Sequence, residues 1–402
     1  MTRILFSGGQ LLDGTGAPPA EADVVIEDGR ILAVGRSLDG DEVVDTTALT
    51  VLPGLFDCHT HVSFSGELDP MRRAVKPFSM RYFEAVANLR STLDVGITTI
   101  REAGGADLGT KQAVEQGLVE GPRMQISITM ISQTGGHGDA HLPSGACLRS
   151  YDPYPGNPSP IVDGPDEMRR RVRELIREGA DVIKVATSGG VLSPRDDPRH
   201  GHFRGEELDV LVAEASAAGL FVMAHAQATA GIAEAVKAGI RSIEHGIYLD
   251  DATIAMMLER GTWLVPTLLA PASVLAAADA GRGVSEWALR KTREVVTVHQ
   301  DSFRLAVAAG VKVAMGTDSG VGPHGHNLEE LALMVEHSNM TPLQAWTATT
   351  ASAAALLGLA DELGTVEPGK RADLVLLKGD TTDLDKLADR IAGVWKDGRR
   401  YR

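Results

Sequence analysis

Residues 52–61 read LPGLFDCHTH, an apolar run that leads into two histidines separated by one residue. The continuous apolar character of the run is typical of a buried β-strand. Residues two apart on a strand point to the same side, so His59 and His61 can face one metal ion together. Imidazole is a ligand that suits zinc and related ions. Alone, such a pair is a weak indication, because a histidine near a strand end is more often a hydrogen-bonded core residue.

Runs of the same type recur through the middle of the chain. Apolar, strand-like runs cover residues 51–57, 97–102, 125–131, 181–187, 220–225, 242–245, 262–267 and 311–318. Helical patterns lie between most of them, at residues 166–178, 206–218, 229–238 and 250–260. Buried runs separated by helices predict parallel strands joined by crossovers. Over roughly 300 residues, eight such runs fit a (β/α)8 TIM barrel, although a doubly wound open sheet uses the same alternation.

Both ends of the chain read as short strands. Two apolar runs between residues 24 and 34 are joined by Asp28-Gly29, and an Asp-Gly pair in this setting is a strong signal of a β-hairpin. Further strands and a second Asp-Gly pair follow at residues 372–377 and 393–398. We therefore expect a small β-sandwich domain from both termini and a central catalytic barrel, with the bounds 1–52 and 360–402 for the first and 53–359 for the second.

Composition limits the classes of partner and compartment. The chain has 402 residues and a net charge of −15 at pH 7, which argues against nucleic acid because such binding depends on Lys and Arg contacts with phosphate. A membrane helix needs roughly 18 consecutive apolar residues, and no such run occurs, so no membrane partner is expected. Two cysteines, Cys58 and Cys147, cannot form a disulfide framework, which favours a reducing compartment, the cytoplasm.

Residue types that bind metals gather where the expected strands end, which is where a (β/α)8 barrel keeps its active site. Besides the first histidine pair, His225, His245 and Asp318 end three other runs. Lys184 lies among apolar residues of the fourth run, and a buried ammonium is costly unless it is paired or chemically altered. Each residue alone could be a core or turn residue. Their coincidence at one edge of the sheet predicts a metal site.

These residues resemble the amidohydrolase superfamily, and the resemblance covers nearly the whole chain. Residues 52–61 look like the first-strand motif of the superfamily, and the four later residues follow in its order and approximate spacing. Residues 364–374 look like its return into a β domain that both termini build. The resemblance implies a metal-dependent hydrolase with two divalent ions, which we expect to be zinc.

By this resemblance, six residues share the two ions. His59, His61 and Asp318 would hold one ion, the two remaining histidines would hold the other, and Lys184, carboxylated on its amine, would bridge both. A metal-bridging hydroxide would attack the amide carbonyl. Asp318 would take the proton of the bridging water and pass it to the leaving nitrogen. Some relatives use one ion and an unmodified residue at the fourth strand.

A closer resemblance indicates the prolidase-like branch of the superfamily, which contains Xaa-Pro dipeptidases and zinc carboxypeptidases and is related to the imidazolonepropionases. The residues that carry it are 135–139, 182–194, 244–249 and 317–320. It implies that His137 and Tyr248 contact the substrate carbonyl and stabilise the oxyanion. An ordinary loop histidine and a core tyrosine are the structural alternatives for these two residues.

Substrates of this branch are small molecules with an amide or peptide bond next to a free carboxylate, as in dipeptides, Xaa-Pro or N-acyl amino acids. A cation should receive the carboxylate, and Arg195, Arg199 and Arg204 lie in the long loop after the fourth run. These arginines could equally face solvent and pair with neighbouring aspartates. His324 and His326, just past the last run, are further candidates for substrate contact.

Several alternatives stay open. One is hydrolysis of a cyclic amide, as by imidazolonepropionase, but that branch typically uses one metal and lacks the lysine found here as Lys184. Relatives also cleave xenobiotic amides and carbamates, which the sequence does not exclude. A non-catalytic metal-binding scaffold predicts a damaged ligand set, whereas all six positions are filled here. We therefore expect an enzyme, and we leave open whether it forms a homo-oligomer.

Overall fold

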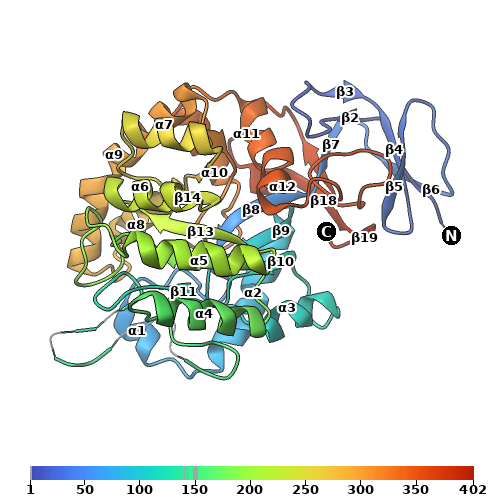
Figure 1. The fold of residues 1–402 in the computed structure, drawn as a ribbon. Helices are drawn as coiled ribbons and strands as arrows, with labels where there is room; N and C mark the ends of the chain where they lie inside the picture. The colour runs from blue at the N-terminus through green and yellow to red at the C-terminus, as the bar shows by residue number, and fades with distance from the viewer. Residues whose placement is uncertain (1, 140, 143, 148–152) are drawn as a thin grey trace.

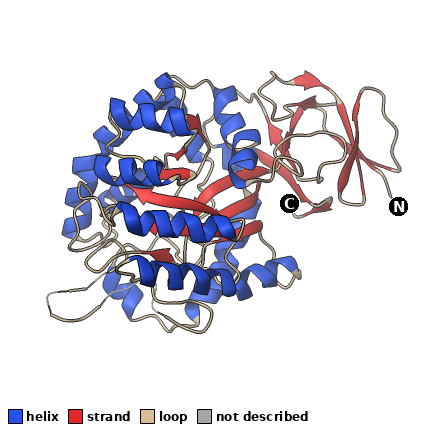
Figure 2. Ribbon diagram, viewed as in Figure 1, coloured by secondary structure: helices blue, strands red, loops and turns tan. Residues whose placement is uncertain are grey.

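The computed structural model describes residues 2–139, 141–142, 144–147 and 153–402. Its architecture is mixed α/β and has two portions (Figure 1). In the larger portion, helices surround the strands, whereas the smaller portion, near both termini, consists mostly of strands (Figure 2). The candidate ligands of the sequence all lie in the larger portion.

The strands of the larger portion form two parallel sheets. The first sheet has the order β10-β9-β8, with β8 (Leu55–Thr60), β9 (Ile97–Glu102) and β10 (Arg123–Ile126). The second runs in sequence order through β11 (Met130–Ile131), β12 (Val182–Ala186), β13 (Phe221–Ala226), β14 (Ser242–His245), β15 (Trp263–Val265) and β16 (Lys312–Val313). All of these pairings are parallel, which confirms the predicted strand direction.

Two of the predicted runs are divided in the structure. Residues 51–57 split at Gly54 between β7 (Leu49–Pro53), which pairs in another sheet, and β8. A Cβ atom at Gly54 would collide with the side chain of Thr98, so the break requires glycine. Residues 125–131 split at Ile128, where a φ of 68° bends the chain. Before the bend β10 pairs with β9, and after it β11 pairs with β12. Apolar character predicted these strands but not their bends.

The last predicted run, residues 311–318, is a strand only at β16. Beyond β16, the chain runs alongside β8, where Cys58 N donates a hydrogen bond to Met315 O at 2.9 Å. Asp318 N donates to His59 O at 2.7 Å, and His61 N donates to Ser319 O at 2.7 Å. These bonds place Asp318 beside the first histidine pair.

Helices lie on the outside of these strands (Figure 2). Their bounds are α1 (Pro70–Ala74), α2 (Met80–Asp94), α3 (Leu108–Glu115), α4 (Pro165–Arg177), α5 (Gly205–Ala217), α6 (Thr229–Ala238), α7 (Asp251–Arg260), α8 (Leu269–Asp279), α9 (Glu286–Ala309), α10 (Glu329–Glu336), α11 (Pro342–Ala348), α12 (Ala351–Leu357) and α13 (Leu387–Arg390). The four predicted helical patterns correspond to α4–α7. In α4, Met168, Val172 and Leu175 are buried at the i, i+4, i+7 spacing, so its apolar stripe faces the sheet.

The smaller portion contains two further sheets, of order β5-β4-β1-β6 and β19-β18-β17-β7-β2-β3. Their strands are β1 (Ile4–Ser7), β2 (Gln10–Leu11), β3 (Ala20–Glu21), β4 (Asp23–Glu27), β5 (Arg30–Gly35), β6 (Glu42–Asp45), β17 (Leu374–Lys378), β18 (Ile391–Lys396) and β19 (Arg399–Arg400). Asp28 and Gly29, with φ of 49° and 75°, turn the predicted β4–β5 hairpin. Phe6 and Trp395, one from each sheet, meet edge-on in a shared apolar cluster.

Cys58 is buried, Cys147 is exposed, and both are free. Within the described ranges, no helix combines the length and apolar character needed to cross a membrane.

Candidate metal centre

A pocket lies at the carboxyl ends of the parallel strands, where the six predicted metal ligands come together. They are His59, His61, Lys184, His225, His245 and Asp318. They come from β8 and the residue after it, from β12, β13 and β14, and from the segment after β16. Carboxyl ends of neighbouring parallel strands meet at one edge, which is why residues far apart in the sequence converge here.

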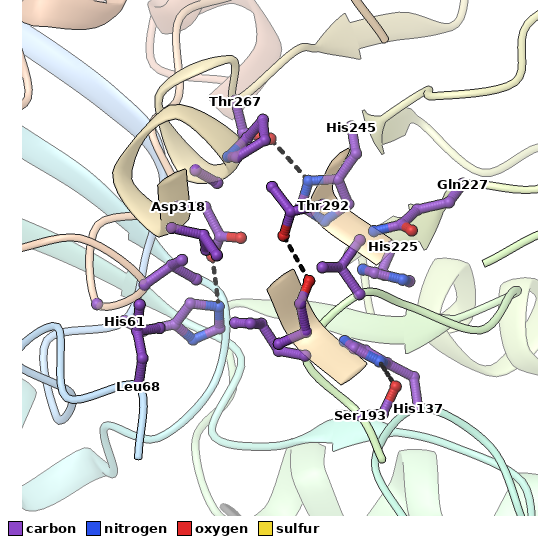
Figure 3. A pocket seen from close by; sticks show the side chains of 18 of the residues that line it. His61, Leu68, His137, Ser193, His225, Gln227, His245, Thr267, Thr292 and Asp318 are labelled. Carbon is purple, nitrogen blue, oxygen red and sulfur yellow. Dashed lines mark hydrogen bonds and ion pairs between the residues drawn. The ribbon is translucent and has the colours of Figure 1, made fainter. Parts of the chain in front are cut away.

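The first histidine pair faces Asp318. His61 Nε2 lies 3.1 Å from Asp318 Oδ1, and His59 Nε2 lies 3.5 Å from the same oxygen. Figure 3 shows the His61 ring directed at the Asp318 carboxylate. Lys184 Nζ lies 3.4 Å from His59 Nε2. One carboxylate, two imidazoles and an amine therefore surround one point.

The other two histidines extend this cluster toward β13. The ring centroids of His225 and His245 are 4.6 Å apart, and those of His59 and His245 are 5.1 Å apart. Ligand atoms of His59, His245 and Asp318 lie within 4.8 Å of one another, a group that could hold a metal ion. His225 Nε2 lies 3.1 Å from Gly189 O, so this nitrogen contacts the loop after β12.

Burial tunes these groups for metal binding. It lowers the pKa of His59, His225 and His245 well below the ordinary value, so their imidazoles are neutral and carry the lone pair that a metal requires. The pKa of His61 is raised instead, because the neighbouring Asp318 outweighs the effect of burial. Burial also lowers the pKa of Lys184 to about 8. The pKa of Asp318 is lowered although burial opposes this, because His59 and His61 favour the carboxylate. Neutral imidazoles with a carboxylate are a donor set that fits zinc.

A buried ion pair holds His59 from the side opposite the pocket. His59 Nδ1 lies 2.8 Å from Glu244 Oε2, and Arg101 Nη2 lies 2.8 Å from Glu244 Oε1. Arg101 Nε also donates to Cys58 O at 2.7 Å. A carboxylate at Nδ1 fixes the ring orientation and directs the Nε2 lone pair to the pocket. Neither Arg101 nor Glu244 was predicted from the sequence, where the available signal was a charged residue inside an apolar run.

Asp57 links β8 to the segment that carries Asp318. Its carboxylate accepts hydrogen bonds from His59 N at 3.0 Å and from Thr317 N at 3.1 Å. Thr317 Oγ1 and Asn327 Nδ2 donate to its other oxygen at 2.6 and 2.8 Å. Burial raises the pKa of Asp57 to about 6. Because all four partners are donors, the ionised carboxylate can accept hydrogen bonds from all of them. Asp57 thereby holds the segment that carries Asp318 close to His59.

Three pocket residues have left-handed backbone conformations, which non-glycine residues rarely adopt. The φ values are 72° at His245, 54° at Thr267 and 59° at Asp318. His245 Nδ1 lies 2.7 Å from Thr267 Oγ1. Such strain costs ~1–3 kcal/mol per residue and concentrates at functional sites.

His137 approaches the ligands from the loop after β11. Its ring stacks on His225 with centroids 4.2 Å apart and planes inclined by 14°. His137 Nδ1 lies 2.9 Å from Ser193 Oγ and 3.5 Å from Asp196 Oδ2. Figure 3 shows His137 beside Ser193 at the edge of the ligand cluster. His137 therefore lies where a contact with a bound substrate is sterically available.

Comparison with known proteins supplies the family. The model of the amidohydrolase family matches residues 50–401. The chain belongs to the amidohydrolase family. The ochratoxinase of Aspergillus niger is 35% identical to this amidohydrolase, in an alignment that covers 99% of this chain and 86% of that protein.

Two further relatives of the amidohydrolase extend this comparison. A crystal structure of a Xaa-Pro dipeptidase with bound methionine in the active site has a TM-score of 0.91 and 32% identity, with 100% of both chains covered. The imidazolonepropionase of Porphyromonas gingivalis is 26% identical over 89% of this chain and 83% of its own. The protein is accordingly an enzyme, a hydrolase of the amidohydrolase family.

The predicted carboxylate-binding arginines of the amidohydrolase are not among the described residues that line the pocket. Arg195 is exposed. Arg199 is exposed and paired with Asp197 at 2.6 Å, as the solvent-facing alternative predicts. Arg204 is exposed at the start of α5, and its Nη1 donates to Phe203 O at 3.2 Å.

Of the other predicted substrate contacts, His137 lines the pocket, whereas Tyr248, His324 and His326 lie outside the described lining. Tyr248 is half-buried, and its N donates to Gln227 O at 2.9 Å. His324 is buried, with Nε2 3.0 Å from Phe64 O, so it supports the loop after His61. His326 is exposed and paired with Glu329 at 2.6 Å.

Much of the remaining pocket wall is apolar and comes from segments that our sequence analysis did not assign. Residues of α8 and α9 form part of it, namely Ala270, Pro271, Val274, Trp287, Ala288, Thr292 and Val295. The loop after β8 and α1 contribute Phe64, Leu68, Pro70 and Arg73. Arg73 is the only arginine in the described lining. The length of the loop after β8 could have indicated this segment, since long βα loops are often functional.

Proposed function

We propose that this amidohydrolase cleaves an amide or peptide C–N bond next to a free carboxylate, in a dipeptide, a Xaa-Pro peptide or an N-acyl amino acid. The observation that carries the proposal is the convergence of six metal-ligand residues in one pocket that also contains an arginine. Similarity to the Xaa-Pro dipeptidase supports the peptide substrate. Similarity to ochratoxinase supports amide hydrolysis outside ordinary peptides.

We propose further that the pocket binds two divalent ions, with zinc as the expected metal. His59, His61 and Asp318 would hold one ion, His225 and His245 would hold the other, and a carboxylated Lys184 would serve both. The lowered pKa of the Lys184 amine supports the modification, because the neutral amine is the form that reacts with carbon dioxide. When bound, such ions polarise the substrate carbonyl and lower the pKa of the attacking water.

Asp318 is suited to move the proton. Its pKa is lowered by His59 and His61, so it enters the reaction as a carboxylate that can accept a proton from water. Its position in the pocket lets it deliver that proton to the leaving nitrogen. The carboxylate is thus the general base and then the general acid of the proposed reaction.

Two residues are proposed to stabilise the oxyanion. His137 Nδ1 contacts Ser193 and Asp196, which leaves Nε2 to meet the substrate carbonyl. Tyr248 remains a proposed second partner of the carbonyl. Tyr248 lies outside the described pocket lining, so this role requires either a substrate that extends beyond that lining or movement of the segment after β14.

Arg73 is our proposed receiver of the substrate carboxylate, ahead of Arg195, Arg199 and Arg204. It lines the pocket together with Phe64 and Leu68. A guanidinium can bind a carboxylate through two parallel hydrogen bonds. The apolar wall from α8 and α9 would then receive the rest of the substrate.

The larger portion is proposed to be a closed (β/α)8 barrel. Two contacts between the sheets support closure, namely the parallel bridge of Thr60 with Ser319 and the hydrogen bond from Asp181 N to Ile126 O at 2.8 Å. We also keep residues 1–52 and 360–402 as a composite β-sandwich and 53–359 as the catalytic domain. The cytoplasmic location stays a prediction from the cysteine content.

A cyclic-amide hydrolase is the second candidate, because an imidazolonepropionase is among the relatives. Lys184 counts against it for the reason given above. A screen should contain dipeptides, Xaa-Pro peptides and N-acyl amino acids, each with its carboxylate-amide analogue, together with imidazolonepropionate and aryl carbamates. We expect hydrolysis of free-carboxylate substrates and loss of activity on the matched amides. Preference for the cyclic amide or for the blocked analogues would contradict the proposal.

A further inference from the structure

A buried lysine of α9 holds the loop after β12. Lys291 is only 4% exposed. Its ammonium donates to Gly190 O and Ser193 O, both at 2.9 Å, and to Asp196 O at 2.5 Å. The Asp196 Oδ1 atom lies 3.1 Å away. One cation therefore fastens three positions of the segment 189–197 to α9.

Asp196 connects this cation to His137. Its Oδ2 accepts a hydrogen bond from Gly190 N at 2.9 Å and lies 3.5 Å from His137 Nδ1. The Ser193 hydroxyl donates to Asp196 Oδ1 and lies 2.9 Å from His137 Nδ1. Both groups that face His137 Nδ1 are therefore anchored by Lys291.

The loop also fixes the face of the His137 ring. A Cβ atom on Gly190 would collide with the His137 imidazole, so the backbone of the loop lies directly against the ring. His225 stacks on the ring as well, with centroids 4.2 Å apart. With Nδ1 occupied and the ring packed against Gly190 and His225, the orientation of Nε2 depends on the loop being in place.

Stability alone is a weak explanation for this arrangement. A buried ion pair loses hydration on folding, and apolar residues of similar size often serve stability equally well. Ala288, Thr292 and Val295 of the same helix line the pocket. The helix α9 thus shapes the substrate site and orders the loop that faces His137.

We propose that Asp196 and Lys291 are positioning residues of the hydrolytic reaction, which act by holding His137 so that its Nε2 meets the substrate carbonyl. This inference rests on the proposed function, because that function gives His137 its contact with substrate. Neither Asp196 nor Lys291 is among the described residues that line the pocket. Their effect on the reaction should therefore pass through His137.

A double-mutant cycle measures this dependence. Asp196→Asn should lower kcat at least about 10-fold, because small displacements of a catalytic group can cost about 100-fold, while the metal content of the protein stays unchanged. In a His137→Ala background, the same change should lower kcat less than about 2-fold, since residues that act as one unit are not additive. Asp197→Asn is the matched control, because this neighbour pairs with the exposed Arg199.

If Asp196→Asn does not fold, Lys291→Met takes its place in a second double-mutant cycle with His137→Ala. This substitution keeps the side-chain volume and removes the charge. Additive losses of kcat in both backgrounds would overturn the positioning role and leave the proposed function intact. Wild-type kcat in His137→Ala would overturn both the oxyanion role and the inference. A wild-type protein that hydrolyses no amide of the screen would contradict the proposed function itself.

Discussion

Two loops that follow strands of the parallel sheets differ in how they meet the pocket. The loop after β12 carries three arginines, and all three are exposed. No functional residue was predicted in the loop after β8. This loop and α1 nevertheless contribute Phe64, Leu68 and Arg73 to the pocket wall. The number of cations in a loop therefore does not predict which cation lies in the pocket. Lys291 holds the inner half of the β12 loop. This half lines the pocket with Val191, Leu192 and Pro194, whereas the three arginines of the loop are not among the described lining residues.

The strand ends behave differently from both loops. Backbone hydrogen bonds and strand register fix where their side chains lie, so His59 and Asp318 are brought together whatever the loops do. Function should therefore be most sensitive to change at the strand ends, less at the β8 loop and least at the outer β12 loop.

Replacement of the general base at a strand end should have the largest effect. Asp318→Asn should lower kcat about 100- to 10,000-fold, the range of general acid–base catalysis, while most of the bound metal is kept. Steady-state kinetics on the best substrate of the screen, with metal analysis of the same sample, measures both quantities. Near-normal turnover in this variant would remove Asp318 from its assigned role.

Replacement of the residue that orients His59 should have the second-largest effect. Glu244→Gln removes the charge that orients His59 Nδ1, and loss of such a partner typically lowers metal affinity or activity about 10- to 100-fold. Competition with a chromophoric chelator measures the affinity. Unchanged affinity in Glu244→Gln would show that strand register alone orients the ring.

The β8 loop should affect substrate binding more than turnover. Arg73→Ala should raise KM for carboxylate substrates about 10- to 100-fold, which corresponds to the loss of a hydrogen bond between charged groups, and should leave kcat close to wild type. The matched substrate with a blocked carboxylate is the control and should show no difference between the two proteins. An equal rise in KM for the free and the blocked substrate would mean that Arg73 contributes only to the shape of the pocket.

The outer β12 loop should have the smallest effect. Arg199→Ala removes an exposed ion pair, and such pairs contribute little, so kcat/KM should stay within about 2-fold of wild type. The same kinetic assay provides the measurement. A large rise in KM here, with none in Arg73→Ala, would reverse the comparison and restore the sequence-based assignment.

The sequence predicted the strand ends well because periodicity and residue type suffice there. A histidine, lysine or aspartate at the end of an apolar run must lie at the carboxyl edge of a parallel sheet, and all six predicted ligands do line the pocket. The supporting pair Arg101 and Glu244 was missed because a contact between distant strands has no local pattern. The bend at Ile128 likewise depends on which neighbour each half of the strand pairs with.

Loop residues were harder to predict for a physical reason. A loop follows no fixed period, so Tyr248 could not be placed inside or outside the pocket from its motif alone. The segment after β16 illustrates the same limit, because a predicted long strand proved to be mostly hydrogen-bonded coil beside β8.

Metal analysis of the purified wild-type chain measures whether the strand ends hold two metal ions. Protein expressed with ample zinc and freed of loosely bound metal should be analysed by inductively coupled plasma mass spectrometry. We expect close to two divalent ions per chain. Less than one ion per chain would contradict this expectation.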